Sequence, residues 1–131
     1  MECPCCSLMP YEICCGPLHA GDRVASSPQA LMKSRFAAFA LQKAQYIHDT
    51  YVQEERESHS VESIQKSLEG RIWTRLEISN VFVENPTLGW VEFVAFCTVM
   101  GREYALREKS AFRKDEEGWR YWNKRSVQKK S

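Results

Sequence analysis

The chain has 131 residues, which suits one ordinary domain with a short appendage and a hydrophobic core of its own. Its 18 basic and 17 acidic residues leave a formal net charge of +1, so no overall attraction favours nucleic acid or an anionic membrane. No apolar run approaches the ~20 residues that a membrane-spanning helix needs. We therefore expect neither a nucleic-acid-binding protein nor a membrane protein.

Cysteines gather at the N-terminus in a pattern that predicts a metal site. Cys3 and Cys5 form one close pair and Cys14 and Cys15 a second, with eight residues between them. A structural zinc ion takes four thiolate or imidazole ligands, and two close pairs on a short loop can surround it. The N-terminal residues lack the basic and apolar segments of a secretory signal, so we expect a cytoplasmic protein whose cysteines stay reduced. The sequence thus predicts zinc held by these cysteines.

Other residues bear on the chemistry of this site. His19 is close enough in sequence to replace one cysteine, or it lies beside the ligands without touching the metal. Cys6 follows Cys5 directly and could compete with it for the ion. Cys97 stands alone in an apolar run, which favours a buried core thiol over a nucleophile. Four protein ligands leave no position open for an activated water, so we expect a structural rather than a catalytic metal.

The composition of the chain changes at Ser26-Ser27-Pro28. The residues before this point hold most of the cysteines and prolines, whereas those after it show the apolar periodicities of regular structure. We therefore predict a small N-terminal zinc-binding module over residues 1–27 and a larger domain over residues 28–131.

Helices are predicted directly after this boundary. Ser27 has the side chain of an N-cap, Pro28 suits the first helical position, and the apolar residues that follow recur at helical spacing. We expect one long helix over about 28–51, with an apolar stripe broad enough to pack on a sheet. The polar segment 53–60 then leads into a shorter helix over about 61–68, which a glycine ends.

The apolar period changes to two from Ile72 onward. Several runs of this kind follow, bounded by turn residues such as Gly, Asn, Asp and Pro, and we predict antiparallel strands. They cover about 72–82, 90–100, 104–114 and 119–124. Helices followed by meandering strands indicate an α+β domain in which a curved antiparallel sheet wraps around the long helix. Such a cone has an open mouth where a ligand pocket can form.

Polar residues expected inside this cone are the pocket candidates. Glu108 and Ser110 share a strand face that otherwise looks apolar. A carboxylate that points into the core requires either a charged partner or a role in binding or catalysis. Glu108 either pairs with Arg35 of the long helix, faces outward, or contacts a ligand as an acid, base or polar anchor. Arg35 is that partner, an anion-binding group at the pocket mouth, or a solvated charge on an exposed helix face. Trp73 belongs to a set of aromatic residues that line the pocket or pack in the core.

The N-terminal segment CPCCSLMPYEICCG resembles the SEC-C motif, a small zinc-binding unit found at the C-terminus of the secretion motor SecA and in many other bacterial proteins. Segments of the larger domain, residues 31–40, 108–112 and 118–121, resemble the YchJ family of uncharacterised bacterial proteins. That family joins a SEC-C motif to a domain similar to nuclear transport factor two, a cone of curved sheet and helices with a cystatin-like α+β fold. The resemblance covers nearly the whole chain and implies this fold, with zinc as the cofactor.

One position departs from the SEC-C pattern. The motif usually has Gly immediately after its second cysteine ligand, where this chain has Cys6. Either the backbone here does not need the positive φ that Gly readily adopts, or the extra thiol adjusts the metal site.

The residues and the resemblance together predict function in outline. Our first hypothesis is a cytoplasmic, non-catalytic adaptor whose SEC-C-like module presents a small rigid surface to a protein partner, by analogy with SecA. The alternative is an enzyme or small-molecule binder that uses the cone, with Glu108 as acid, base or polar anchor and Arg35 as an anion clamp. A third hypothesis is a homodimer formed through the open face of the sheet.

Overall fold

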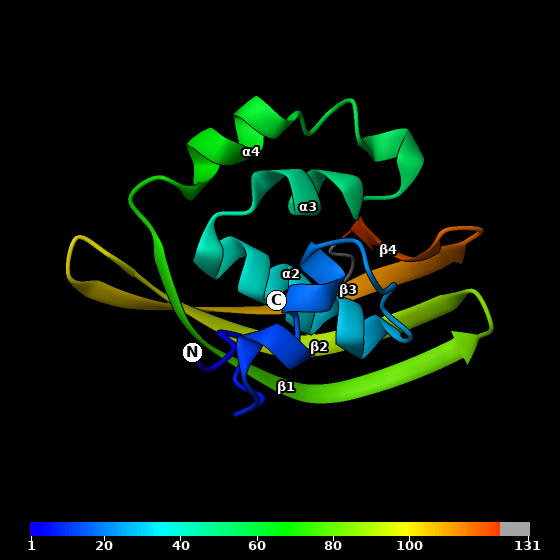
Figure 1. Ribbon diagram of the computed structural model, residues 1–131, viewed down its shortest axis with the longest axis horizontal. Coiled ribbons are helices and arrows are strands. Elements are labelled where there is room, and N and C mark those ends of the chain that lie inside the picture. The colour runs from blue at the N-terminus through cyan, green and yellow to red at the C-terminus, as the bar shows by residue number, and fades with distance from the viewer. Residues whose placement is uncertain (124–131) are drawn as a thin grey trace.

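Helices cover one side of a four-stranded sheet in the computed structural model, which describes residues 1–123 (Figure 1). The helical part comprises η1 (Tyr11–Ile13), α1 (Gly16–His19), α2 (Pro28–Leu41), α3 (Ala44–Asp49), η2 (Gln53–Glu55) and α4 (Val61–Leu68). The sheet comprises β1 (Ile72–Asn85), β2 (Leu88–Val99), β3 (Arg102–Asp115) and β4 (Gly118–Asn123). Position 124, which ends the last predicted strand, lies outside the described residues. Over the described range, none of the helices has the length and apolarity needed to cross a bilayer.

The sheet is an antiparallel meander in the order β1-β2-β3-β4, which confirms the predicted strands and the α+β fold. Residues paired across neighbouring strands face the same side, and the register aligns Ile78 with Phe93 and Phe93 with Glu108. The pairing of β1 with β2 contains register shifts, and such irregularities increase the twist of a sheet. The sheet therefore curves, and its concave side receives α2.

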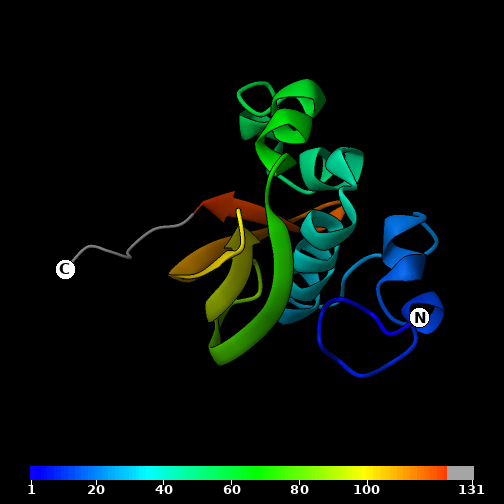
Figure 2. The same ribbon diagram turned by 90° about the vertical axis from the view of Figure 1, so that its left-hand side faces the viewer.

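α2 lies between the sheet on one side and the N-terminal segment on the other (Figure 2). Its predicted N-cap is confirmed, because Ser27 Oγ accepts a hydrogen bond from the Ala30 N–H at 3.1 Å. The main core forms where α2 meets the sheet, and its largest buried members are Leu31, Met32, Phe36, Leu76, Val91, Phe93, Phe112 and Trp119. The helix thus has two buried sides, which is why its apolar residues are not confined to one narrow stripe.

The prediction of one continuous helix over 28–51 is wrong. The helix breaks at Gln42, which adopts a left-handed conformation with φ 60° between the end of α2 and the start of α3. The Lys43 N–H donates to the Ala38 carbonyl at 2.8 Å, a bond that closes the C-terminus of α2 as in a Schellman-type cap. The break allows α3 to change direction rather than continue along the sheet.

α3 and α4 lie above α2 in Figure 1 and form a second, smaller core with it. The buried residues of this core are Ala38, Ala44, Ile47, Ile64 and Leu68. The predicted helix over 61–68 is confirmed, and Ser60 caps it by accepting a hydrogen bond from the Ser63 N–H at 3.1 Å. This second core explains the broken helix, because a straight helix would carry Ile47 away from Ile64 and Leu68.

Candidate functional site

The four cysteines predicted as ligands meet in one cluster. The sulfur atoms of Cys3, Cys5, Cys14 and Cys15 all lie within 4.8 Å of one another. Cys5 Sγ is 3.6 Å from Cys14 Sγ, which in turn is 4.0 Å from Cys15 Sγ. Cys3, Cys5 and Cys15 are buried and Cys14 is half-buried. Four convergent thiols shielded from solvent form a metal-binding centre.

Backbone hydrogen bonds bring the two cysteine pairs together. The Cys3 N–H donates to the Met9 carbonyl at 2.8 Å, and the Cys14 N–H donates to the Tyr11 carbonyl at 3.1 Å. Gly16 follows the second pair where a side chain has no room, since a Cβ built there would lie 2.8 Å from the Tyr11 carbonyl oxygen. The loop between the pairs is therefore closed tightly enough to aim both pairs at one point.

The thiols of the cluster share negative charge unequally. A hydrogen bond from the Cys15 thiol lowers the pKa of Cys5, while the same contact, together with burial, raises the pKa of Cys15. Burial also raises the pKa of Cys3. One thiolate is thus stabilised while its neighbours hold their protons. A bound cation would supply the positive charge that lets all four ionise, and thiolate is the form that binds metal.

His19 lies beside the cluster and joins the N-terminal module to α2. Its Nε2–H donates to the Ser34 carbonyl at 2.8 Å, and its Nδ1 accepts from the Tyr11 hydroxyl at 2.7 Å. Burial lowers the pKa of His19, which favours the neutral ring that this pattern requires. Tyr46 packs its ring 4.7 Å from the imidazole and hydrogen-bonds the Ser34 hydroxyl at 2.7 Å. Both ring nitrogens are therefore occupied, and the alternative in which His19 replaces a cysteine ligand is wrong.

Cys6 lies outside the cluster, with its exposed thiol 3.6 Å from the Pro4 carbonyl oxygen. Its backbone has φ 70°, so this position does need the left-handed conformation that Gly provides in the SEC-C pattern. The alternative in which the chain avoids a positive φ here is wrong. Cys97 is buried on β2, with 7% of its surface exposed, as expected for a core thiol.

The four pocket candidates, Arg35, Trp73, Glu108 and Ser110, line one cavity of about 390 Å³ between α2, the sheet and the segment after α3. Glu108 pairs in register with the buried Phe93, so it lies on the concave side of the sheet and the outward-facing alternative is wrong. The cavity brings together residues from α2, β1 and β3. The role of each in binding or catalysis stays a prediction.

Arg35 is buried, with 3% of its surface exposed, so the alternative of a solvated charge is wrong. Its guanidinium donates to the Ile47 carbonyl at 3.0 Å and to Thr50 Oγ1 at 2.6 Å. The rings of Tyr51 and Tyr121 lie 4.6 and 4.5 Å away, at cation–π distance. Burial lowers the pKa of Arg35, and the tyrosines oppose that change. Sequence reasoning missed this cage because its members come from α3, the following loop and β4, with no shared motif.

The fold and the cluster together define a class of small proteins in which a cysteine-rich metal module packs on the long helix of an α+β cone. The sequence model of the family described as "YchJ, middle NTF2-like domain" matches residues 27–124. A UPF0225 protein from Vibrio cholerae serotype O1 is 34% identical over 122 residues, which span 92% of this chain and 80% of that protein. This chain therefore belongs to the YchJ family.

Solved structures of similar proteins agree with this assignment. The solution structure of a SEC-C motif containing protein from Rhodopseudomonas palustris is 36% identical, with a TM-score of 0.89, and the match covers 98% of this chain and 100% of that one. A crystal structure of a SEC-C motif containing protein from Psychrobacter arcticus shares the fold at 23% identity and a TM-score of 0.83, covering 100% of this chain and 84% of that one. The predicted combination of a SEC-C motif with an NTF2-like domain is confirmed.

Proposed function

We propose that this protein is a zinc-binding adaptor whose N-terminal module contacts a protein partner in the cytoplasm, where thiols stay reduced. The sulfur separations support zinc as the metal. Tetrahedral zinc with Zn–S bonds of about 2.3 Å requires sulfur atoms about 3.8 Å apart. The Cys5–Cys14 and Cys14–Cys15 separations of 3.6 and 4.0 Å lie close to that value, and every separation among the four sulfur atoms is within 4.8 Å. Thiolate ligands also favour zinc over magnesium or calcium, which prefer oxygen.

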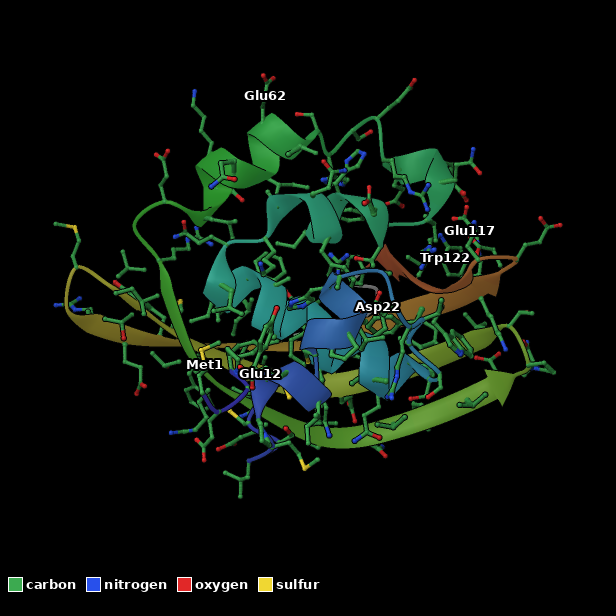
Figure 3. The ribbon with its side chains drawn as sticks, in the orientation of Figure 1. Met1, Glu12, Asp22, Glu62, Glu117 and Trp122 are labelled. Carbon is green, nitrogen blue, oxygen red and sulfur yellow. The ribbon has the colours of Figure 1, made fainter. Side chains whose placement is uncertain are left out.

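One observation carries the adaptor proposal: the module exposes large apolar side chains around its buried cysteines. Leu8 is 78% exposed and Ile13 is 59% exposed, with Met1 and Met9 exposed beside them in the sequence. Clustered exposed apolar side chains mark interaction surfaces, because water contact is unfavourable for them. Figure 3 shows Met1 of the module far from Glu117 and Trp122 at the β4 end of the sheet.

Partner capture from cell extract, with mass spectrometry of the captured protein, tests this proposal. Leu8→Asp combined with Ile13→Asp should abolish capture of a specific protein while the metal is retained. Val83→Asp is the matched control, because Val83 is 56% exposed on β1, outside the module. Cys14→Ser should lose metal and capture together, whereas Glu108→Gln should keep both. Undiminished capture by the Leu8/Ile13 variant or by Cys14→Ser would remove the adaptor function.

Elemental analysis of the purified protein tests the metal separately. We expect one zinc ion per chain, retained in Cys6→Gly and lost in Cys14→Ser. Another bound metal, or none with all the thiols reactive, would contradict the zinc assignment.

The cavity favours a second candidate function, the binding of a small molecule inside the cone. Its volume of about 390 Å³ falls within the range of ligand sites, roughly 300–1,000 Å³. It combines mostly apolar walls with a few polar groups, including Glu108, as such sites do. Ligand-induced stabilisation that Glu108→Gln abolishes would support it, and a ligand that also reacts would make the protein an enzyme.

A further inference from the structure

Aromatic side chains form a large part of the walls of the cone cavity. α2 supplies Phe36 and Phe39, and the sheet supplies Trp73, Phe93 and Tyr121. Phe36 and Phe39 meet the Trp73 ring edge-on, with centroids 6.2 and 5.9 Å apart, which leaves ring faces and edges directed at the space between them. Flat apolar groups pack well against such walls. The shape and lining therefore suit a compact aromatic molecule.

One buried polar atom in the cavity wall is unpartnered. Trp73 Nε1 has no hydrogen-bond partner among residues 1–123, whereas the fully buried Ser110 side chain interacts with the Tyr121 hydroxyl. Buried polar atoms in native proteins nearly always have partners, because leaving them unpaired costs free energy. The indole N–H can only donate, so its missing partner must be an acceptor. A ligand that satisfies it carries an acceptor at one edge.

The formal charges around the cavity balance one another. Arg35 and Arg71 line it with positive charge, and Glu55 and Glu108 with negative charge. A charged ligand would bring an unmatched charge into a largely apolar space and would lose its own hydration there. An uncharged ligand leaves the balance intact. Charge therefore selects for neutral molecules.

We propose that the cone binds an uncharged, flat aromatic molecule of one or two fused rings that carries a carbonyl-type acceptor. The rings lie among the aromatic walls, and the acceptor receives the Trp73 Nε1–H. This inference rests on the second candidate function, binding inside the cone, and adds the chemical class of the ligand.

A matched series of probes of similar size tests the ligand class on the full metal-loaded chain. Isoquinolin-1(2H)-one is neutral and has a carbonyl acceptor, naphthalene has no acceptor, and 1-naphthoate carries a negative charge. Affinities come from titrations followed by two-dimensional 15N–1H NMR, in which each indole N–H gives its own signal. We expect isoquinolin-1(2H)-one to bind roughly threefold to tenfold more tightly than naphthalene, the gain typical of one hydrogen bond. 1-Naphthoate should bind more weakly than either.

One variant connects binding to the unpartnered indole N–H. Trp73→Phe should weaken isoquinolin-1(2H)-one binding roughly threefold to tenfold more than it weakens naphthalene binding, because both probes lose ring contacts and only the first loses a hydrogen bond. Trp90→Phe is the matched control, because Trp90 Nε1–H already donates to Glu84 at 3.0 Å and does not line the cavity. In the wild type the Trp73 indole signal should move on binding while the Trp90 signal stays in place.

Each contrary outcome overturns a defined part of the inference. Binding of 1-naphthoate as tight as that of isoquinolin-1(2H)-one would overturn neutrality. Binding that leaves the Trp73 signal unmoved, or that Trp73→Phe weakens no more than it weakens naphthalene binding, would overturn the acceptor. If no probe binds up to its solubility limit, the inference fails. None of these results bears on the adaptor function, which partner capture tests separately. If 1-naphthoate binds and the other two probes do not, the cone still binds a small molecule, but the proposed ligand class is wrong.

Discussion

Cys6 and Leu8 hold left-handed backbone conformations in the loop between the cysteine pairs, with φ 70° and 69°. A side chain with a Cβ in this conformation costs about 1 kcal/mol relative to Gly, since the Cβ crowds the following carbonyl oxygen. The buried cysteines and the backbone hydrogen bonds of the loop therefore hold it in a shape that its own residues disfavour.

Cys6→Gly should raise the free energy of unfolding of the metal-loaded protein. We expect a gain of about 0.5–1 kcal/mol, because Gly adopts the positive φ without steric strain. The greater flexibility of Gly in the unfolded chain offsets part of this gain. Chemical denaturation at fixed metal concentration measures the change. Cys6→Ala is the control, since it removes the thiol and keeps the strained backbone. An equal gain in Cys6→Ala would assign the effect to the thiol instead.

Tyr121 provides a titratable probe of the cavity wall. Burial raises the pKa of its hydroxyl, the Arg35 guanidinium opposes that rise, and the Glu108 carboxylate adds to it. A tyrosine in the unfolded chain ionises near pH 10, so above this pH the unfolded state loses its proton first. The stabilising contribution of Tyr121 is thus complete below about pH 10 and is lost as pH rises from there through the raised folded pKa.

Phenolate absorbance is measured as a function of pH in the wild type and in Tyr121→Phe. The difference between the two curves reports Tyr121 and should have its midpoint above pH 10. The free energy of unfolding of the wild type should also fall more steeply than that of Tyr121→Phe as the pH rises beyond 10. A difference midpoint at or below 10 would mean that water reaches this hydroxyl freely.

At the scale of elements, His19 links α1 to α2 through its imidazole. His19 connects the Ser34 carbonyl of α2 with the Tyr11 hydroxyl of the module, so its removal takes this hydrogen-bond partner from each. His19→Phe keeps a ring against Tyr46 but should lower the free energy of unfolding by about 1–3 kcal/mol.

Amide hydrogen exchange distinguishes detachment of the module from a general loss of stability in His19→Phe. We expect faster exchange in the module, residues 1–27, while the central strands β2 and β3 keep their protection. Uniform acceleration along the chain would show that His19 stabilises the whole molecule rather than this one contact.

Local signals explain which elements were predictable from the sequence. Ser27 and Ser60 cap helices through bonds to residues three positions later, so the chemistry lies within a few residues. The break at Gln42 lacks the glycine or proline that would mark it, because the packing of α3 on α4 imposes it. A residue pattern read along the chain does not contain that contact.

The same distinction holds for the two sites. All four cysteines of the metal centre lie within the first sixteen residues, so their spacing was enough to predict the ligand set. The cage around Arg35 joins α2 to Thr50, Tyr51 and Tyr121, residues that the fold alone brings together. The sequence could indicate Glu108 and Arg35 as unusual, but it could not give the partners that hold them.

At the scale of the whole molecule, we expect a homodimer to form through the outer face of the sheet, and this dimer stays a prediction. Arg75 lies 3.9 Å from the centroid of the Phe96 ring and Lys109 lies 5.3 Å from that of Trp90. A dimer through this face would give a sedimentation mass near twice 15.2 kDa, reduced to one chain in Phe96→Asp. A single-chain mass for the wild type at every accessible concentration would remove the hypothesis.

Adjacent residues of α2 serve the two sites. The Ser34 carbonyl accepts the hydrogen bond from the module, and Arg35 lines the cavity, while Ala37 packs against the cysteines. A ligand of either site that favours one position of this helix changes the affinity of the other site, and thermodynamic linkage makes the factor equal in both directions. Because α2 contacts both sites, a single coupling constant, measured from either site, would describe any linkage between metal binding and ligand binding in the cavity.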